Sequence, residues 1–184
     1  MDPSIKKIHH VAYRCRDARE TALWYEKHLG MKLMLSIAED AVPSTGESDP
    51  YMHIFLDAGQ GNVLAFFELP GSPPQDRDRN TPVWTQHLAL EVESLEALLA
   101  ARQRLESAGI EVIGPTDHAM FQSIYFFDPS GHRLELAANT GSAKMLAALD
   151  EVKWAMLDEW AQTKRAPKHA AWMHDGSYKE KFAS

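Results

Sequence analysis

The sequence predicts an α+β fold in which a βαβββ module occurs twice and is followed by a C-terminal helix. Two stretches of the chain repeat one pattern, the first beginning at His10 and the second at His87. Each opens with a short alternating strand and continues into a helix whose apolar residues recur every three or four positions. A strand, a loop and two more strands follow in each copy. A repeated supersecondary pattern indicates a duplicated structural unit.

The length of 184 residues fits a single domain, which we expect to span residues 1–184. Within it, module one covers 8–69 and module two covers 83–138. The polar, proline-rich stretch 70–82 is the predicted linker, and 141–184 is a predicted helical extension. The loop Asp40–Pro50 makes module one longer than module two.

The module helices have clear start and stop signals. Asp17 and Ser94 stand at predicted N-caps, and Gly30 and Gly109 stand where the helices should end. The later strands are expected at Tyr51–Asp57, Val63–Leu69, Ser123–Phe127 and His132–Ala137. A further helix is expected from Lys144, with one apolar face that serves as core or as a dimer interface, formed by Met145, Leu149, Val152, Met156 and Trp160.

Composition excludes several classes of protein. The net charge of −7 argues against a nucleic-acid partner, and the scattered Lys and Arg residues form no patch for a membrane surface. No stretch is apolar for long enough to form a transmembrane helix. The single cysteine, Cys15, fits a reducing compartment, and the N-terminal residues lack the apolar run of a signal peptide. We therefore expect a cytoplasmic protein.

Strand alternation predicts which side chains share a face. Val11, Tyr13 and Cys15 should pack beneath the first helix, which directs His10 to the opposite face and His9 to the helix side. His87 occupies the position equivalent to His10 in module two. Leu134 and Leu136 should face the second helix, leaving Glu135 with the histidines.

The same alternation, applied to the last strand of module one, predicts that Phe66 and Glu68 point away from the first helix. Two histidines and two glutamates then occupy repeat-related positions. Imidazole nitrogen and carboxylate oxygen are ligands that divalent metals accept. The sequence therefore predicts a metal site formed by these residues, with His53 and His132 as non-ligands.

The doubled module, with its H-V and H-L openings and its D-P-S-G-H-R-L-E close, resembles the vicinal oxygen chelate superfamily, which includes glyoxalases, bleomycin resistance proteins and extradiol dioxygenases. The resemblance covers about residues 8–138. It implies a cupped, partly open mixed sheet around a metal ion. It also implies that His10, His87 and Glu135 are the metal ligands, and that Glu68 matches a fourth ligand position of the glyoxalase-like lyases.

The stretch Thr116–Glu135 resembles the signature of the extradiol ring-cleavage dioxygenases, closest to short one-domain enzymes of the 2,3-dihydroxybiphenyl dioxygenase type. The signature is filled by His118, Ile124–Tyr125, Asp128–Pro129, Gly131 and Glu135. The resemblance implies non-haem Fe(II), with Mn(II), Ni(II) or Zn(II) as alternatives, and an aromatic diol and O₂ as substrates. It further implies a homodimer active in aromatic hydrocarbon catabolism.

Two histidines and one carboxylate leave adjacent metal positions open for a catecholate and O₂. His118 is the expected acid–base, because imidazole titrates near neutral pH, and Tyr125 is expected to donate a hydrogen bond to substrate. An apolar slot for the flat ring is expected from Phe66, Phe121 and Phe127.

Three interpretations stay open at this point, because a fold does not choose a reaction. The first is the Fe(II) extradiol dioxygenase. The second is a glyoxalase-like metal-dependent lyase, isomerase or epimerase that uses His10, Glu68, His87 and Glu135. The third is a non-catalytic binding module similar to the drug-sequestering proteins of the superfamily, although these generally lack the metal residues.

Overall fold

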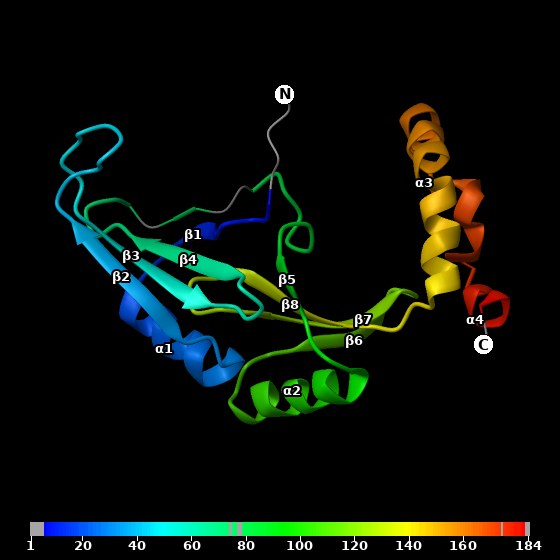
Figure 1. Ribbon diagram of the computed structural model, residues 1–184, viewed down its shortest axis with the longest axis horizontal. Helices are drawn as coiled ribbons and strands as arrows, with labels where there is room; N and C mark the ends of the chain where they lie inside the picture. The colour runs from blue at the N-terminus through cyan, green and yellow to red at the C-terminus, as the bar shows by residue number, and fades with distance from the viewer. Residues whose placement is uncertain (1–5, 74, 77–78, 174, 183–184) are drawn as a thin grey trace. The chain divides into compact units, whose positions relative to one another are not determined.

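The computed structural model describes residues 6–73, 75–76, 79–173 and 175–182 and confirms the α+β fold (Figure 1). Module one contains β1 (Val11–Cys15), α1 (Ala18–Leu29), β2 (Leu33–Glu39), β3 (Tyr51–Asp57) and β4 (Val63–Glu68). Module two contains β5 (Leu88–Glu91), α2 (Leu95–Ser107), β6 (Ile113–Asp117), β7 (Phe121–Phe127) and β8 (Arg133–Asn139). The C-terminal extension contains α3 (Ala143–Thr163), the 3₁₀ helix η1 (Lys168–Met173) and α4 (Tyr178–Lys181).

Parts of three predicted segments lie outside the described residues. These are residues 1–5 of the N-terminal segment, 74 and 77–78 of the linker, and 174 and 183–184 of the extension. Within the described part of the chain, no helix is long and apolar enough to cross a membrane.

Each module forms its own four-stranded sheet. The strand order is β1-β4-β3-β2 in the first sheet and β5-β8-β7-β6 in the second. In the first sheet β1 runs parallel to β4, whereas β3 is antiparallel to both β2 and β4. In Figure 1, α1 and α2 each lie against the sheet of their own module. The first strand of each module is therefore an edge strand of its sheet.

The chain divides into two compact units that do not coincide with the modules. The first unit combines Met1–Leu88 with Phe127–Leu134, and the second combines Ala89–Phe126 with Glu135–Ser184. The turn between β7 and β8 therefore belongs to the unit that contains module one.

The predicted helix signals hold in detail. The Asp17 side chain accepts a hydrogen bond of 2.7 Å from the Glu20 N–H, and Ser94 caps α2 in the same way through Ala97. Gly30 has φ of 69°, a left-handed conformation in which its N–H satisfies a carbonyl at the end of α1. The rigid helix start at Asp17 fixes where β1 ends.

Packing beneath α1 corrects the predicted orientation of β4. The ring of Phe66 is fully buried and lies 5.1 Å, between centroids, from the ring of Tyr25 in α1. Phe66 therefore points toward the helix, not away from it. Tyr13 and Cys15 pair with Phe66 and Glu68 along β1 and β4, so these residues share the helix side, as alternation predicts for Tyr13 and Cys15.

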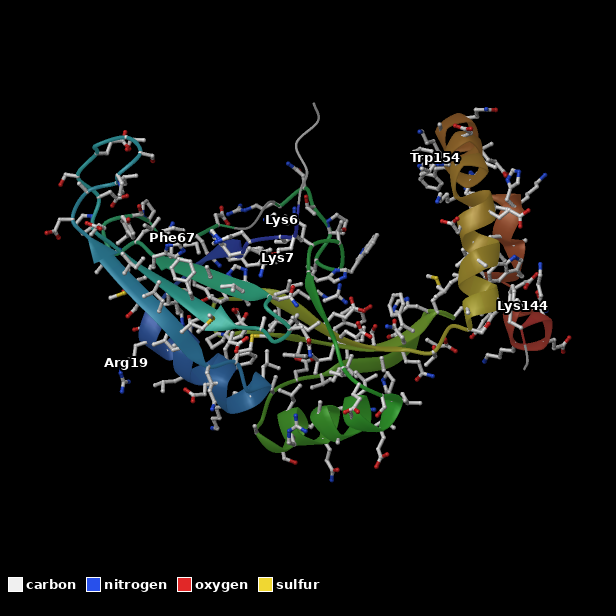
Figure 2. The ribbon with its side chains drawn as sticks, in the orientation of Figure 1. Lys6, Lys7, Arg19, Phe67, Lys144 and Trp154 are labelled. Atoms are coloured by element: carbon white, nitrogen blue, oxygen red, sulfur yellow. The ribbon has the colours of Figure 1, made fainter. Side chains whose placement is uncertain are left out.

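The C-terminal extension has a small core of its own. Met145, Ala170 and Trp172 are buried together, and Met120 of the β6–β7 turn packs against them. Most of the predicted α3 stripe contributes to this core, but Trp160 is 47% exposed and lies outside it. Figure 2 shows Trp154 projecting from α3 on the side away from η1. The exposed apolar side chains of α3 are Leu146, Trp154, Leu157 and Trp160.

Candidate active site

A buried carboxylate lies on the face of the second sheet that points away from α2. Glu135 is only 3% exposed, and the Ser123 hydroxyl donates a short hydrogen bond to its Oε1. Leu134 and Leu136, on either side of Glu135, are buried on the opposite face, as predicted. The carboxylate is thus held in one orientation by a neighbouring strand. Alternation from Tyr125 could have identified Ser123, because residues two apart in a strand share a face.

His118 and Tyr125 form a hydrogen-bonded pair on the same strand face. The distance from His118 Nε2 to the Tyr125 hydroxyl is 2.8 Å. Tyr125 is 7% exposed and His118 is half-buried, so the pair is largely shielded from water. Because Ser123 and Tyr125 alternate with Ile124, the pair and Glu135 lie on one face of β7 and β8. The two residues that the sequence assigns to catalysis are therefore in direct contact.

The ring of His118 also contacts Phe121, with 4.8 Å between centroids. Alternation places Phe121 and Phe127 on the strand face of Tyr125, and Phe127 is 37% exposed. Two of the three phenylalanines predicted to line an aromatic slot therefore lie on the expected side of β7. The third, Phe66, is buried beneath α1 and does not contribute.

His10 precedes β1 on the face of the first sheet that α1 leaves open. Its ring lies 6.2 Å from that of His53 and 5.7 Å from that of Phe55, between centroids. His9 Nδ1 and His10 Nδ1 are 2.8 Å apart. This contact leaves Nε2 as the His10 nitrogen directed away from His9, which suits a metal ligand whose second nitrogen is oriented by a neighbour.

His53 adds a second imidazole to this face, although the sequence analysis predicts that it is not a metal ligand. Its ring stacks on Phe67 at 3.6 Å, and its Nε2 atom is buried without a hydrogen-bond partner among the described residues. Burial, with a smaller contribution from nearby His10, lowers the pKa of His53 below its ordinary value. The open face of the first sheet is therefore rich in imidazole and aromatic rings, which alternation had not predicted for Phe67.

His87 lies at a cavity of about 480 Å³ in the first unit. The cavity walls include Tyr13, Tyr25 and His132. His132 Nε2 is 2.6 Å from the carbonyl oxygen of Arg14, an engagement that agrees with its predicted role as a non-ligand. His87 is exposed, as is His10, so both imidazoles are accessible to a ligand.

Glu68 occupies a different position from the predicted one. Its Oε2 accepts a hydrogen bond of 2.7 Å from the main-chain N–H of Ala18, the first residue of α1. The prediction that Glu68 points away from the helix is therefore wrong. A carboxylate at a helix N-terminus is stabilised by the helix dipole and by the unpaired N–H groups there. This contact gives Glu68 a structural role within module one.

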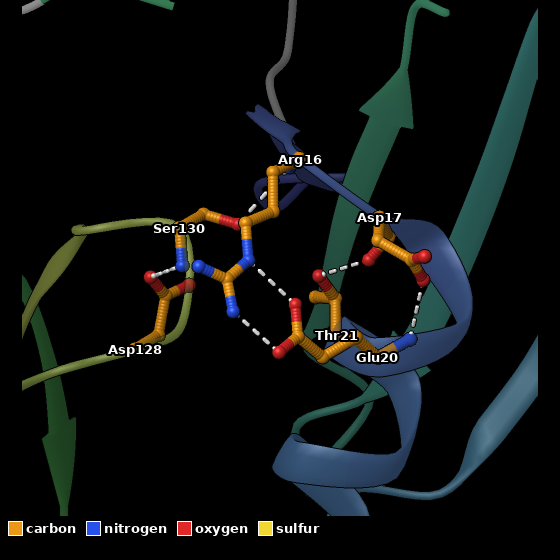
Figure 3. A network of polar contacts seen from close by, with 6 residues as sticks. All are labelled: Arg16, Asp17, Glu20, Thr21, Asp128 and Ser130. Atoms are coloured by element: carbon orange, nitrogen blue, oxygen red, sulfur yellow. Dashed lines mark hydrogen bonds and ion pairs between the residues drawn. The ribbon is translucent and has the colours of Figure 1, made fainter. Parts of the chain in front are cut away.

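The D-P-S-G turn is organised by a buried carboxylate. Asp128 is 6% exposed, and its Oδ2 accepts a hydrogen bond of 3.0 Å from the Tyr25 hydroxyl. Its Oδ1 accepts from the main-chain N–H groups of Ser130 and His132. The Ser130 hydroxyl in turn accepts from the Arg16 N–H, next to the N-cap of α1 (Figure 3). The turn is therefore a structural anchor, and its own signature residues, Asp128, Pro129 and Gly131, need no chemical role.

The predicted metal ligands are not gathered in one place within the units: His10 lies beside His53 and Phe55 on the face that α1 leaves open, whereas the His87 cavity is lined by Tyr13 and Tyr25 of the helix side. His10 and His87 belong to the first unit and Glu135 to the second. Across the residues that the structure describes, no group of three or more His, Cys, Asp or Glu side chains is gathered tightly enough to hold a metal ion. The donor types themselves, two accessible imidazoles and one oriented carboxylate, fit a divalent transition metal.

Comparison with known proteins shows the family and the fold of the chain. The family model of the Glyoxalase/Bleomycin resistance protein/Dioxygenase superfamily matches residues 7–136. A Bacillus subtilis (strain 168) protein named as a candidate ring-cleaving dioxygenase, MhqA, is 30% identical over 139 residues, which are 73% of this chain and 41% of MhqA. The chain thus spans less than half the length of that relative.

Solved structures share the fold. A glyoxalase family protein from Enterococcus faecalis is 27% identical with a TM-score of 0.53, covering 72% of this chain and 97% of that one. The fosfomycin resistance protein FosX from Listeria monocytogenes, in a mutant form complexed with Mn(II) and a dihydroxypropylphosphonic acid, is 17% identical with a TM-score of 0.53. That alignment covers 78% of this chain and 99% of FosX.

The chain belongs to the Glyoxalase/Bleomycin resistance protein/Dioxygenase superfamily, also called the vicinal oxygen chelate superfamily, as the match over residues 7–136 establishes. The C-terminal extension that contains α3, η1 and α4 lies beyond the matched region. The superfamily is mostly enzymatic, and its members bind divalent metals. This membership leaves the reaction and the metal to be inferred from the site.

Proposed function

We propose that this protein is a non-haem Fe(II)-dependent extradiol dioxygenase that cleaves the ring of a catechol-type aromatic diol. The reaction adds both atoms of O₂ to the diol, breaks one ring carbon–carbon bond beside the hydroxyl-bearing carbons, and yields an open-chain product with a carbonyl group and a carboxylic acid. Both oxygen atoms end in the product, so no external reductant is required.

The observation that carries the proposal is the contact of 2.8 Å between His118 Nε2 and the Tyr125 hydroxyl. Both residues occupy their places in the dioxygenase signature, and both lie on the strand face that carries the buried Glu135. A proton-transferring group beside a metal-binding carboxylate is the combination that ring cleavage needs. The MhqA relative, named as a candidate ring-cleaving dioxygenase, supports the same reaction class.

In this proposal His10, His87 and Glu135 bind the metal, and Ser123 orients the carboxylate through its hydrogen bond to Oε1. A bound Fe(II) would hold the diol and O₂ next to each other and would allow electrons to pass from the diol to O₂. Two neutral ligands and one anionic ligand leave room for the diol to bind as an anion. Mn(II) is an alternative metal with the same ligand preferences.

The proton steps are assigned to His118 and Tyr125. The diol must lose a proton when it binds, and an oxygen atom must gain one before the ring opens. His118 accepts the first proton at an imidazole nitrogen and returns it later, because imidazole exchanges protons near neutral pH. Tyr125 donates a hydrogen bond that holds a substrate oxygen beside His118. Phe121 contacts the His118 ring, and Phe127 shares the strand face of Tyr125 by alternation, so we expect these rings to exclude water from the flat substrate ring.

The lyase interpretation loses its main support. It requires Glu68 as a fourth ligand or as a base, but the Glu68 carboxylate accepts the Ala18 N–H at the start of α1. The binding-module interpretation does not explain two features of the site. These are the contact between His118 and Tyr125 and the fixed orientation of Glu135.

The test begins with anaerobic purification and measurement of bound iron, manganese, nickel and zinc. The protein is then loaded with Fe(II), mixed with 2,3-dihydroxybiphenyl or catechol in air-saturated buffer, and observed for the yellow ring-opened product. We expect oxygen consumption equal in moles to the product formed. Mass spectrometry with ¹⁸O₂ should find both labelled atoms in the product.

An iron-loaded protein that forms no ring-opened product from any of several catechols would contradict the proposal. So would a product that carries a single ¹⁸O atom, since that indicates a monooxygenase. The matched control is His118→Phe, which should bind iron without turning over substrate.

A further inference from the structure

The backbone beside His118 adopts a strained turn. The Met120 N–H donates a hydrogen bond of 2.8 Å to the His118 carbonyl, and the His118 N–H donates one of 2.9 Å to the Phe121 carbonyl. Ala119, between the donor and the acceptor of the first bond, has φ of 67°. A three-residue turn with positive φ at a non-glycine centre is rare and costs energy. It persists only where its surroundings hold it.

The first support comes from Asp117, which precedes His118. Its Oδ1 accepts a hydrogen bond of 2.8 Å from the Ala119 N–H, inside the turn. Its Oδ2 accepts one of 2.7 Å from the hydroxyl of Tyr178, at the start of α4. The hydrogen bond from Tyr178 is the main reason that the pKa of Asp117 lies below its ordinary value. One carboxylate therefore ties the strained turn to the C-terminal extension.

The second support comes through Met120, which follows the turn. Its carbonyl accepts hydrogen bonds of 2.8 and 2.7 Å from the N–H groups of Thr140 and Gly141, just before α3. Its side chain packs against the buried cluster of the extension, which contains Met145 and Trp172. A Cβ atom at Gly141 would lie 3.1 Å from both Cα and the carbonyl oxygen of Met120, so this approach is close.

The donors in both supports, Tyr178 in one and Thr140 and Gly141 in the other, lie beyond residue 136, where the region matched by the superfamily model ends. η1 lies alongside α3 in Figure 1, and the two helices share the buried cluster that receives Met120. The extension thus contacts the turn on both sides of His118, through Asp117 before it and Met120 after it. Through these two contacts the extension can set the position of His118.

We propose that the C-terminal extension positions His118 against Tyr125, and that Tyr178 and Asp117 are the positioning residues that transmit its hold. This inference rests on the proposed function, in which the His118–Tyr125 pair moves protons. A loosened turn would let the imidazole leave hydrogen-bond distance of the tyrosine hydroxyl. Misplacement of a catalytic group by about 1 Å can cost on the order of 100-fold in rate.

The test compares Tyr178→Phe, which removes the hydroxyl but keeps the ring in the cluster, with Thr163→Ala. The control also removes a hydroxyl from the extension, one that donates to the Glu159 carbonyl far from the turn. We expect Tyr178→Phe to lower kcat about tenfold, within the loss that misplacement can cause, with KM and bound metal unchanged. Thr163→Ala should keep the kcat of the original protein.

A second readout does not depend on turnover. The ring signals of His118 are followed by NMR in ¹⁵N-histidine-labelled protein and assigned by their loss in His118→Phe. We expect Tyr178→Phe to shift or broaden these signals, and Thr163→Ala to leave them unchanged. If the His118 signals of Tyr178→Phe match those of the original protein, the positioning role is wrong, whatever the activity. If they shift in a protein that cleaves no catechol, positioning stands and the proposed function falls.

Asp117 provides a pair of variants for the case in which Tyr178→Phe unfolds. Asp117→Asn keeps an acceptor for the Ala119 N–H and offers its amide to the Tyr178 hydroxyl, so it should retain most of kcat. Asp117→Ala loses both hydrogen bonds and should lower kcat about tenfold. Equal kcat values for the alanine and asparagine variants would overturn the proposal.

Discussion

Glu68 Oε2 lies 2.7 Å from the main-chain nitrogen of Ala18, so the last residue of β4 caps the first residue of α1. This contact supports one of the two proposed chemistries over the other. As a metal ligand, Glu68 would make a lyase site with two carboxylates. As the partner of a helix N-terminus, it stabilises module one, and the proposed metal site then has Glu135 as its carboxylate.

Replacement of Glu68 by glutamine should therefore lower stability and not activity. Loss of the negative charge at the helix N-terminus should cost about 0.5–1 kcal/mol in the free energy of unfolding. Urea denaturation followed by circular dichroism measures this loss. Iron content and the rate of ring cleavage should match those of the original protein. A folded variant that loses its metal or its activity would show that Glu68 belongs to the site, as the lyase interpretation requires.

Cys15 should make the free energy of unfolding fall at alkaline pH. Burial raises the pKa of its thiol from 9.0 to about 11, with smaller contributions from nearby carboxylates. Between these values the unfolded chain has lost the thiol proton and the folded protein keeps it. The folded state binds more protons, so the free energy of unfolding should fall as pH rises through this range.

The measurement is urea denaturation at several pH values between 9 and 11, for the original protein and for Cys15→Ala. The slope of stability against pH should be smaller in Cys15→Ala. Some slope should persist, because burial and Asp128 also raise the pKa of the Tyr25 hydroxyl. Identical slopes for the two proteins would contradict this account of Cys15.

The sequence predicts the fold closely where local signals are strong. Asp17 and Gly30 mark the ends of α1 because an N-cap side chain and a left-handed glycine are each specified by a single residue. Strand β3 has the predicted bounds, Tyr51–Asp57. The sequence also singles out His118 and Tyr125 through the dioxygenase signature, but their contact with each other is a finding of the structure.

The orientation of β4 could not be predicted from its own residues. The run V-L-A-F-F in Val63–Phe67 is apolar at every position, so alternation does not define a face. Pairing with β1 and burial of Phe66 against Tyr25 set the orientation, and both are tertiary contacts. The hydrogen bond from Tyr178 to Asp117 joins residues that are 61 apart in sequence, so no local sequence pattern predicts it.

The exposed apolar side chains of α3, which are Leu146, Trp154, Leu157 and Trp160, should mediate a dimer. Trp154 is 70% exposed and Leu157 is 57% exposed on one long helix, which leaves large apolar side chains in water. The net charge of −7 disfavours an anionic membrane or a nucleic acid as the covering partner. A second copy of the chain offers the same apolar side chains, and packing the two sets against each other removes both from water.

Light scattering coupled to gel filtration should find a dimer for the original protein and a monomer for the double variant Trp154→Glu and Leu157→Glu. The matched control is Leu99→Glu, which adds a charge at a similarly exposed leucine of α2 and should stay dimeric. A monomeric original protein, or a dimeric double variant, would show that α3 is not the interface.

Separate variants should divide metal binding from proton transfer. His118→Phe should keep its iron and lose activity by about 10²–10⁴-fold, the range expected for general acid–base catalysis. His10→Ala should lose iron, because a facial site with one imidazole missing binds metal weakly. Metal analysis of the purified variants and oxygen-consumption rates test both expectations. Unchanged iron in His10→Ala would remove His10 from the ligand set.

Ser123→Ala should weaken metal binding without removing a ligand. The Ser123 hydroxyl donates to Glu135 Oε1 in a buried position, and a carboxylate so held keeps one oxygen in place for the metal. Loss of an orienting partner of this kind typically costs ten- to hundredfold in metal affinity, so we expect a fall of about tenfold in Fe(II) affinity. At saturating iron, turnover should recover.

Competition with a coloured chelator, under anaerobic conditions, measures the Fe(II) affinity of the original protein, Ser123→Ala and Ser123→Thr. Threonine keeps the hydroxyl and should retain the affinity, whereas alanine should not. If Ser123→Ala binds Fe(II) as tightly as the original protein, Glu135 does not depend on Ser123 for its orientation. If Glu135→Gln also leaves the affinity unchanged, Glu135 is not a ligand and the metal site must be sought elsewhere.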